Sequence, residues 1–315
     1  MRKLLSFVIP CYRSENTIEK VIAEIISVVS QKPEYDYEII AVNDCSPDNV
    51  YSVLLKLADE NEKIKIIDFS KNFGKHSAVL AGMELASGDF IVGLDDDGQC
   101  PVNRLWDLLE PVENGSFDYS MADYPVLKES GIKRIGSKIN SLMSRILVGR
   151  PKGLYFSNFY LMKKFVAKEM VKYKNPYPYL EGLTIRTTLN IVTVPMEERE
   201  RFEGTGHYTL RKSLALWFNG FTAFSIIPLR IASILGFVVA ALGFFFGLFV
   251  VIRKVLNPSI AVGYSSTISV ILFIGGIIMI MLGLIGEYLG RIYISLNSSP
   301  QYVIKETVNF KNKED

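Results

Sequence analysis

Three consecutive aspartates are the residues of this sequence best suited to binding a metal ion. Asp95 and Asp97 are two positions apart, so in an extended segment their side chains point to the same side, and Gln99 continues that side with a neutral oxygen. Carboxylate and amide oxygens suit Mg²⁺ or Mn²⁺, with substrate phosphates and water as further ligands. The alternative is a solvated acidic turn, because a D-x-D pattern also arises by chance. We favour a metal site of Asp95, Asp97 and Gln99, since three aspartates at the end of a buried strand are costly unless their charge is compensated.

A second polar group lies earlier in the chain. Asp44 can accept a hydrogen bond from an imide N–H, which uracil has and cytosine lacks, and Tyr12 can stack on the same base or bind its ribose. The alternative role for Asp44 is to cap the turn at residues 46–48. Neither a G-x-G-x-x-G nor a G-x-x-x-x-G-K-[ST] motif is present in the sequence, so neither dinucleotide redox chemistry nor P-loop hydrolysis is indicated.

These polar residues follow the strands of a regular alternating pattern. The segments between the strands have apolar residues at the three- and four-residue spacing of helices. Alternation at this interval predicts an α/β fold, with a mostly parallel sheet and helices on both faces. Ligands bind beyond the carboxyl ends of such strands, where Asp44 and the three aspartates lie. The continuous apolar runs that predict buried strands are residues 4–10, 38–42, 64–69 and 90–94.

The overall composition excludes several classes of protein. Of the 315 residues, 49% are hydrophobic and 22% are charged, which is not typical of a disordered or fibrous chain. The net charge of +2 provides no long-range field for a polyanion, so we expect no nucleic-acid partner. The three cysteines are widely spaced and form no C-x-x-C pair, so neither a disulfide framework nor a zinc site is indicated.

Two uncharged apolar segments, residues 231–252 and 268–286, predict membrane-spanning helices. Each is long enough, at about 1.5 Å per residue, to cross a hydrocarbon core of about 30 Å. The alternative is a buried helical hairpin in a soluble core. Lysine and arginine are more frequent outside the hairpin than in its connecting loop. By the positive-inside rule we expect the two helices to cross the cytoplasmic (inner) membrane, with both termini and the first domain on its cytoplasmic side.

The segment before the hairpin has an amphipathic pattern. Its aromatic residues cluster on one helical face behind Arg211 and Lys212, which predicts an interfacial helix in contact with membrane lipid. A buried amphipathic helix is the alternative. The sequence thus predicts a cytoplasmic domain at 1–210, an interfacial region at 211–229, a two-helix transmembrane hairpin at 230–292 and a cytoplasmic tail at 293–315.

The motifs together resemble those of family 2 glycosyltransferases. The ending GLIGEYLGRIY at 283–293, after two spans, is similar to the polyprenyl-phosphate group of that family, which includes dolichyl-phosphate mannose synthase. The resemblance implies a GT-A type nucleotide-binding domain. It also implies an inverting transfer of a sugar from a nucleotide sugar, with a UDP-sugar favoured, to a polyprenyl phosphate such as undecaprenyl phosphate. The matching strings are VIPCY at 8–12, VNDCSPD at 42–48, NFGKH at 72–76 and DDDGQ at 95–99.

The resemblance also implies roles for individual residues. For two residues of the acceptor-phosphate set the sequence leaves an alternative. Arg134 can be a solvated surface charge without a binding role, and Arg201 can form ion pairs with the glutamates around it. The catalytic set is Asp97, Arg201 and Asn158. The nucleotide-sugar set is Pro10, Tyr12, Asp44, Asp95 and Asp96, and the acceptor-phosphate set is Arg134, Ser137 and Arg201.

Asn158 departs from the family, which has an aspartate at this position. A hydroxyl acceptor has to lose a proton to a base, whereas a phosphate monoester is already mostly ionised at pH 7, so an asparagine is compatible with a phosphate acceptor. Two alternatives stay open: a glycosyltransferase acting on a lipid or polysaccharide hydroxyl, and a non-catalytic membrane scaffold of a lipid-sugar translocation system. We also expect the chain to form a homo-oligomer.

Overall fold

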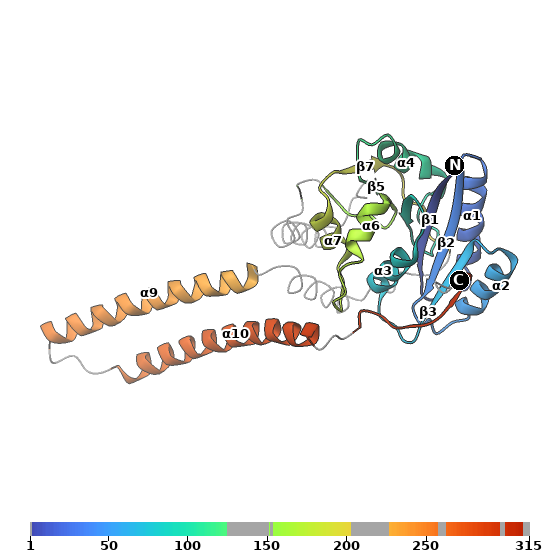
Figure 1. Cartoon of the computed structure of the whole chain (residues 1–315). Helices are drawn as coiled ribbons and strands as arrows, with labels where there is room; N and C mark the ends of the chain where they lie inside the picture. The colour runs from blue at the N-terminus through green and yellow to red at the C-terminus, as the bar shows by residue number, and fades with distance from the viewer. Residues whose placement is uncertain are drawn as a thin grey trace. The chain divides into compact units, whose positions relative to one another are not determined.

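The computed structural model describes residues 2–124, 151, 154–202, 227–257, 263–296 and 300–310 (Figure 1). The chain forms two compact units. The first comprises Met1–Ser213 together with Ser299–Asp315, and the second is Leu214–Ser298. The first unit contains a sheet of eight strands, and the second contains two long apolar helices.

The first half of the sheet confirms the predicted alternation of strands and helices. The predicted strands at 4–10, 38–42, 64–69 and 90–94 each coincide with an observed strand to within a few residues, because continuous apolar runs leave one conformation that buries both faces. The elements are β1 Lys3–Cys11, α1 Ile18–Ser30, β2 Tyr35–Asn43, α2 Val50–Glu60, β3 Ile64–Phe69, α3 Lys75–Leu85, β4 Phe90–Gly93, a 3₁₀ turn Val102–Arg104 and α4 Leu105–Glu113.

Among the described residues, the second half of the chain adds four strands and two short helices to the first unit. The strand order is β7-β5-β6-β4-β1-β2-β3-β8, with β6 antiparallel to both β4 and β5, and β8 antiparallel to β3. The remaining pairs are parallel, so the sheet is mostly parallel as predicted. The added elements are β5 Tyr119–Asp123, β6 Tyr160–Lys163, α6 Lys164–Met170, α7 Leu180–Thr187, β7 Ile191–Pro195 and β8 Ile304–Val308.

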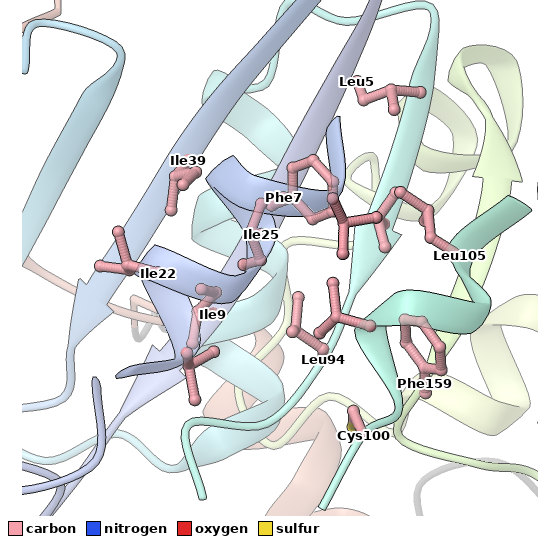
Figure 2. Close-up of a cluster of buried hydrophobic side chains, with 14 of the residues drawn as sticks. Leu5, Phe7, Ile9, Ile22, Ile25, Ile39, Leu94, Cys100, Leu105 and Phe159 are labelled. Atoms are coloured by element: carbon pink, nitrogen blue, oxygen red, sulfur yellow. The ribbon is translucent and has the colours of Figure 1, made fainter. Parts of the chain in front are cut away.

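Helices cover both faces of the sheet. One face forms the larger core, where Phe7 and Ile9 of β1 pack with Ile22 and Ile25 of α1 and Leu105 of α4 (Figure 2). On the other face α3 lies so close to the sheet that a Cβ atom at Gly82 would be 2.4 Å from Cγ1 of Val8. This close packing fixes the first turn of α3 beside the carboxyl ends of β1 and β2.

The described part of the second unit contains α9, Ile227–Leu256, and α10, Tyr264–Leu296, which contact each other (Figure 1). Both are long and apolar enough to cross a membrane, within Ala232–Phe249 and Phe273–Gly290. Only 6% and 0% of the residues in these two windows are buried. A hairpin in a soluble core would be mostly buried, so the observed exposure argues against that alternative.

The end of the chain differs from the predicted tail at 293–315. Helix α10 continues to Leu296, and β8 at Ile304–Val308 joins the edge of the sheet beside β3. Strand β8 has a Lys-Glu-Thr centre with little apolar character, which is common on an edge strand and gives a weak strand signal. The interfacial helix predicted at 211–229 lies mostly outside the described residues, as do Arg134 and Ser137.

Candidate active site

The carboxyl ends of β1, β2 and β4 bring the predicted site residues together. Cys11 and Asn43 are register partners, so β1 and β2 end at the same level. The backbone N–H of Tyr12 donates a hydrogen bond to Oδ2 of Asp96 at 3.0 Å, and the N–H of Asp44 donates one to the carbonyl of Cys11 at 3.1 Å. The loops after these three strands therefore form one continuous edge, as the parallel topology predicts.

Asp44 holds the loop that leads into α3. It is 3% exposed, and its two carboxylate oxygens accept hydrogen bonds from the N–H groups of Phe73 at 2.7 Å and Gly74 at 2.9 Å. Burial raises the pKa of Asp44 to about 6, and the two N–H donors only partly oppose this increase. The bonds go to this loop rather than to the turn at 46–48, so the predicted alternative of a cap for that turn is wrong. Gly74 has a φ of +89°, which a residue with a side chain rarely adopts.

The three aspartates have different partners. Oδ1 of Asp95 lies 2.5 Å from Nζ of Lys75, the first residue of α3, and Oδ2 of Asp97 lies 3.3 Å from Nε of Arg201. Asp96 accepts the N–H of Tyr12. Burial, together with the charges of Asp95 and Asp97, raises the pKa of Asp96 to about 6.

Arg201 lies beside the proposed metal ligands. Its Nε donates to Oε1 of Gln99 at 2.7 Å in addition to its ion pair with Asp97, and the Gln99 N–H donates to Oδ1 of Asp97 at 3.1 Å. Among the described residues, Arg201 forms its ion pair with Asp97 and not with Glu197, Glu198 or Glu200, three of its predicted alternative partners. A guanidinium at this place can bind a phosphate oxygen bidentately.

The donor set is compatible with a Mg²⁺ or Mn²⁺ ion that shares its ligands with a substrate. Asp95, Asp97 and Gln99 supply oxygen atoms, and protein sites for Mg²⁺ commonly use one or two carboxylates plus substrate phosphates. Within the described residues, no group of three or more His, Cys, Asp or Glu side chains is arranged to hold a metal. The described residues therefore offer a partial set of ligands, to which phosphate oxygens of a substrate could add.

A cavity of about 70 Å³, which we call the β4 cavity, lies next to Asp95. Asn158 is part of its wall, so the structure brings this predicted catalytic residue to the same cavity as Asp95. The polar side chains in the wall are Lys75, His76, Asp95, Ser157, Asn158, Tyr160, Glu181 and Thr184. The apolar and aromatic part consists of Pro10, Val79, Leu94, Tyr119, Phe156, Met162, Met170 and Leu180.

Most of these wall residues were not identified as site residues from the sequence, and three of them have side chains that can take part in binding. His76, Tyr160 and Glu181 are on α3, β6 and α7, which are distant in the chain and carry no motif that links them. The imidazole Nδ1 of His76 lies 3.0 Å from the carbonyl of Pro178, and burial lowers its pKa to about 4. Because a carbonyl only accepts, Nδ1 carries the proton of the neutral ring and Nε2 keeps its lone pair.

Comparison with known proteins shows the family. Residues 6–165 match the model for glycosyl transferase family 2, and residues 227–292 match the model for the GtrB C-terminal hairpin. The chain is 32% identical to the uncharacterized glycosyltransferase YkcC of Bacillus subtilis, over 98% of this chain and 95% of that protein.

Two further relatives have more specific names. The SfII prophage-derived bactoprenol glucosyl transferase of Shigella flexneri is 29% identical over 96% of this chain and 98% of that protein. The undecaprenyl-phosphate 4-deoxy-4-formamido-L-arabinose transferase of Yersinia enterocolitica is 29% identical over 99% and 96%.

The fold of the first unit also occurs in a solved structure. The Mycobacterium tuberculosis glucosyl-3-phosphoglycerate synthase, in complex with Mn²⁺, UDP-glucose and phosphoglyceric acid, superposes with a TM-score of 0.52 at 18% identity, over 69% of this chain and 76% of that one.

Proposed function

Because the chain belongs to glycosyl transferase family 2 and ends in a GtrB-type hairpin, we propose that it transfers a sugar from a nucleotide sugar to a polyprenyl phosphate at a membrane. The observation that supports this most directly is the position of Arg201 against Asp97 and Gln99. A phosphate-binding side chain next to a site for a diphosphate and its metal is the arrangement that a phosphate acceptor requires. Both relatives with specific names use lipid carriers according to those names.

The donor would lie along the carboxyl edge of the sheet. Tyr12, Asp44 and Pro10 would contact the nucleoside. Each oxygen of Asp44 has a further lone pair beyond its bond to Phe73 or Gly74. An imide N–H can bind that lone pair, so we propose a uridine nucleotide. The backbone N–H of Tyr12 donates a hydrogen bond to Asp96 and so holds the carboxylate of Asp96 in place.

The reaction we propose is a single in-line displacement. An oxygen of the acceptor phosphate attacks the anomeric carbon and forms the new C–O bond, while the bond to the diphosphate breaks and its electron pair leaves with the nucleoside diphosphate, which inverts the anomeric centre. A metal ion held by Asp95, Asp97 and Gln99 would supply positive charge to the leaving diphosphate. Arg201, with Arg134 and Ser137 as predicted partners, would orient the acceptor phosphate.

Asn158 has a positioning role in this scheme rather than that of a base. Its carboxamide faces the β4 cavity beside Asp95 and can bind a sugar hydroxyl or a phosphate oxygen. No proton has to leave the acceptor, since a phosphate monoester carries its charge already. We propose the cytoplasmic face for this reaction, because the basic residues near the two apolar helices favour that side under the positive-inside rule.

The test is to incubate the purified full-length chain with undecaprenyl phosphate and a panel of labelled nucleotide sugars, with and without EDTA. We expect a labelled lipid from at least one nucleotide sugar, and loss of the product with EDTA. Parallel reactions with a lipid and a polysaccharide that present only hydroxyl groups address the alternative acceptors. Label in those products and none in undecaprenyl phosphate would overturn the proposal, as would the absence of any transfer.

A further inference from the structure

The hydroxyl group of Tyr160 is unpaired inside the protein. Tyr160 is 7% exposed and lines the β4 cavity, and its hydroxyl is buried without a hydrogen-bond partner among the described residues. Leaving a buried hydroxyl without a hydrogen-bond partner destabilises a protein. Because the unpaired hydroxyl borders a cavity, it can form its hydrogen bond with a ligand that enters this cavity.

The position of this hydroxyl is fixed by its surroundings. Tyr160 is paired with Gly93 across β4 and β6, and a Cβ atom on Gly93 would lie 2.0 Å from Cζ of Tyr160 and 2.3 Å from its hydroxyl oxygen. The phenol therefore occupies the space that a side chain at position 93 would fill. On its other side the ring stacks on Tyr119, with 5.5 Å between centroids and 17° between planes. Gly93 precedes Leu94 and Asp95, so the hydroxyl lies at the base of the proposed diphosphate site.

The other polar groups of the cavity indicate which ligand fits. The lone pair of His76 Nε2 and the carboxylate of Glu181 are acceptors, and the charge of Asp95 is matched by that of Lys75. The cavity therefore offers several hydrogen-bond acceptors, two of which are carboxylates. Hydroxyl or amino groups can donate to such a wall, whereas a carboxylate can only accept and would leave these acceptors without a donor.

The size of the cavity limits which part of a substrate can enter it. A cavity of about 70 Å³ has room for several water molecules, and so for the substituents of a sugar ring, but not for a nucleoside or a polyprenyl chain. The cavity lies beside Asp95, which belongs to the proposed diphosphate site, and the sugar of a donor is bonded directly to the diphosphate.

We infer that the β4 cavity receives the sugar of the donor, that the Tyr160 hydroxyl hydrogen-bonds a hydroxyl of that sugar, and that the wall selects neutral or amino sugars over uronic acids. This inference rests on the proposed function, because it takes the donor to be a nucleotide sugar. Tyr160 is thus a specificity residue for the transferred sugar, and it has no role in binding the nucleotide.

The first experiment compares Tyr160→Phe with Tyr124→Phe in the full-length chain. Tyr124 also has a buried hydroxyl without a partner among the described residues, but it does not line the cavity, so it is the matched control. Calorimetric titration with the nucleotide sugar that the wild type binds most tightly, and with the corresponding nucleoside diphosphate, measures both affinities without an acceptor lipid. We expect Tyr160→Phe to weaken binding of the nucleotide sugar about tenfold, to leave nucleoside diphosphate binding unchanged, and to leave the Tm unchanged or raised. Tyr124→Phe should leave both affinities unchanged.

The second experiment compares the wild-type kcat/KM for UDP-glucose, UDP-N-acetylglucosamine and UDP-glucuronic acid. We expect UDP-glucuronic acid to be at least about 100-fold poorer than the best neutral sugar.

The outcomes separate this inference from the proposed function. Equal nucleotide-sugar affinity in the wild type and Tyr160→Phe, or efficient transfer of glucuronic acid, would overturn the sugar assignment even if a labelled polyprenyl phosphate forms. A tenfold loss confined to Tyr160→Phe, without any lipid product, would support the cavity assignment and reject the polyprenyl acceptor.

Discussion

At the scale of single residues, the aspartates of the site differ in burial and in partners, and so they should differ in the effects of substitution. Asp44 and Asp96 are bound by backbone N–H groups, whereas Asp95 and Asp97 are matched with side-chain cations. The first pair shapes the loops of the site, and the second pair can exchange its cations for those of a substrate complex.

Replacing Asp97 with alanine should lower kcat/KM by about 100-fold or more, because a proposed metal ligand and the partner of Arg201 are lost together. Steady-state kinetics on the purified enzyme measures this effect. Asp107→Ala is the matched control, because Asp107 is an exposed carboxylate paired with Arg104 away from the site. Near-normal turnover by a folded Asp97→Ala enzyme would contradict the assignment.

The raised pKa of Asp44 predicts a pH dependence of nucleotide binding. An oxygen that carries a proton below about pH 6 no longer accepts an imide N–H, so the affinity for a uridine nucleotide should fall about tenfold between pH 7 and pH 5. Calorimetric titration across this range measures the change. Asp44→Asn should lack this step, and parallel pH profiles for the two proteins would show that another group is responsible.

The raised pKa of Asp44 also affects the stability of the fold, with a pH dependence opposite to that of nucleotide binding. The folded-state pKa of about 6 lies above the ordinary value of 3.8, so the folded state binds this proton more tightly than the unfolded state does. The contribution of Asp44 to the free energy of unfolding is therefore fully present below pH 3.8, and it is lost as the pH rises through 6. Binding of the nucleotide and stability of the loop thus favour different protonation states of one side chain.

At the scale of elements, β8 completes an edge of the sheet and holds the end of the chain. Ahead of the strand, the ring of Tyr302 stacks on Phe69 of β3 with 5.3 Å between centroids, and Gln301 donates to the carbonyls of Tyr173 and Asn175. Within the strand, Lys305 pairs with the buried Asp68 at 3.1 Å. These contacts join the last segment of the chain to β3 and to the segment after α6.

A chain that ends at residue 299 should therefore be less stable than the full chain, because the edge of β3 and the ring of Phe69 become exposed. We expect the Tm of the sheet unit to fall by about 5 °C or more, as measured by thermal unfolding in detergent. A chain that ends at residue 310 keeps β8 and serves as the control. Equal Tm values for the two truncated chains would show that β8 adds nothing to stability.

The sequence predicted the elements whose signal is local. The first four strands and the helices between them follow from apolar runs and helical spacing, and the parallel pairing then brings Asp44 and the three aspartates to one edge. Strand β8 was missed because a short edge strand needs few apolar residues. His76, Tyr160 and Glu181 were missed because their common cavity arises from packing between α3, β6 and α7, which no local pattern records.

At the scale of the whole molecule, β8 constrains the topology in the membrane. Because β8 pairs with β3, the chain before α9 and the chain after α10 belong to one sheet and must lie on the same side of any membrane that the two helices cross. From the positive-inside rule we predict that this side is the cytoplasm.

Labelling of cysteines in intact cells tests this orientation. Native Cys45 is exposed in the first unit, whereas Cys11 and Cys100 are buried, and Asn257→Cys places a thiol at the end of α9. A membrane-impermeant maleimide should label Asn257→Cys in intact cells and should label Cys45 only after permeabilisation. Labelling of Cys45 in intact cells would reverse the predicted orientation.

The pairing of the last strand with the third also sets an order of events during synthesis. The ribosome has made β3 long before it makes β8, and both apolar helices are translated in between. Until translation ends, the nascent sheet has an open edge at β3, which is a surface that pairs readily with other chains. The sheet can therefore close this edge only after both apolar helices have been translated, so its fold is completed at the end of synthesis.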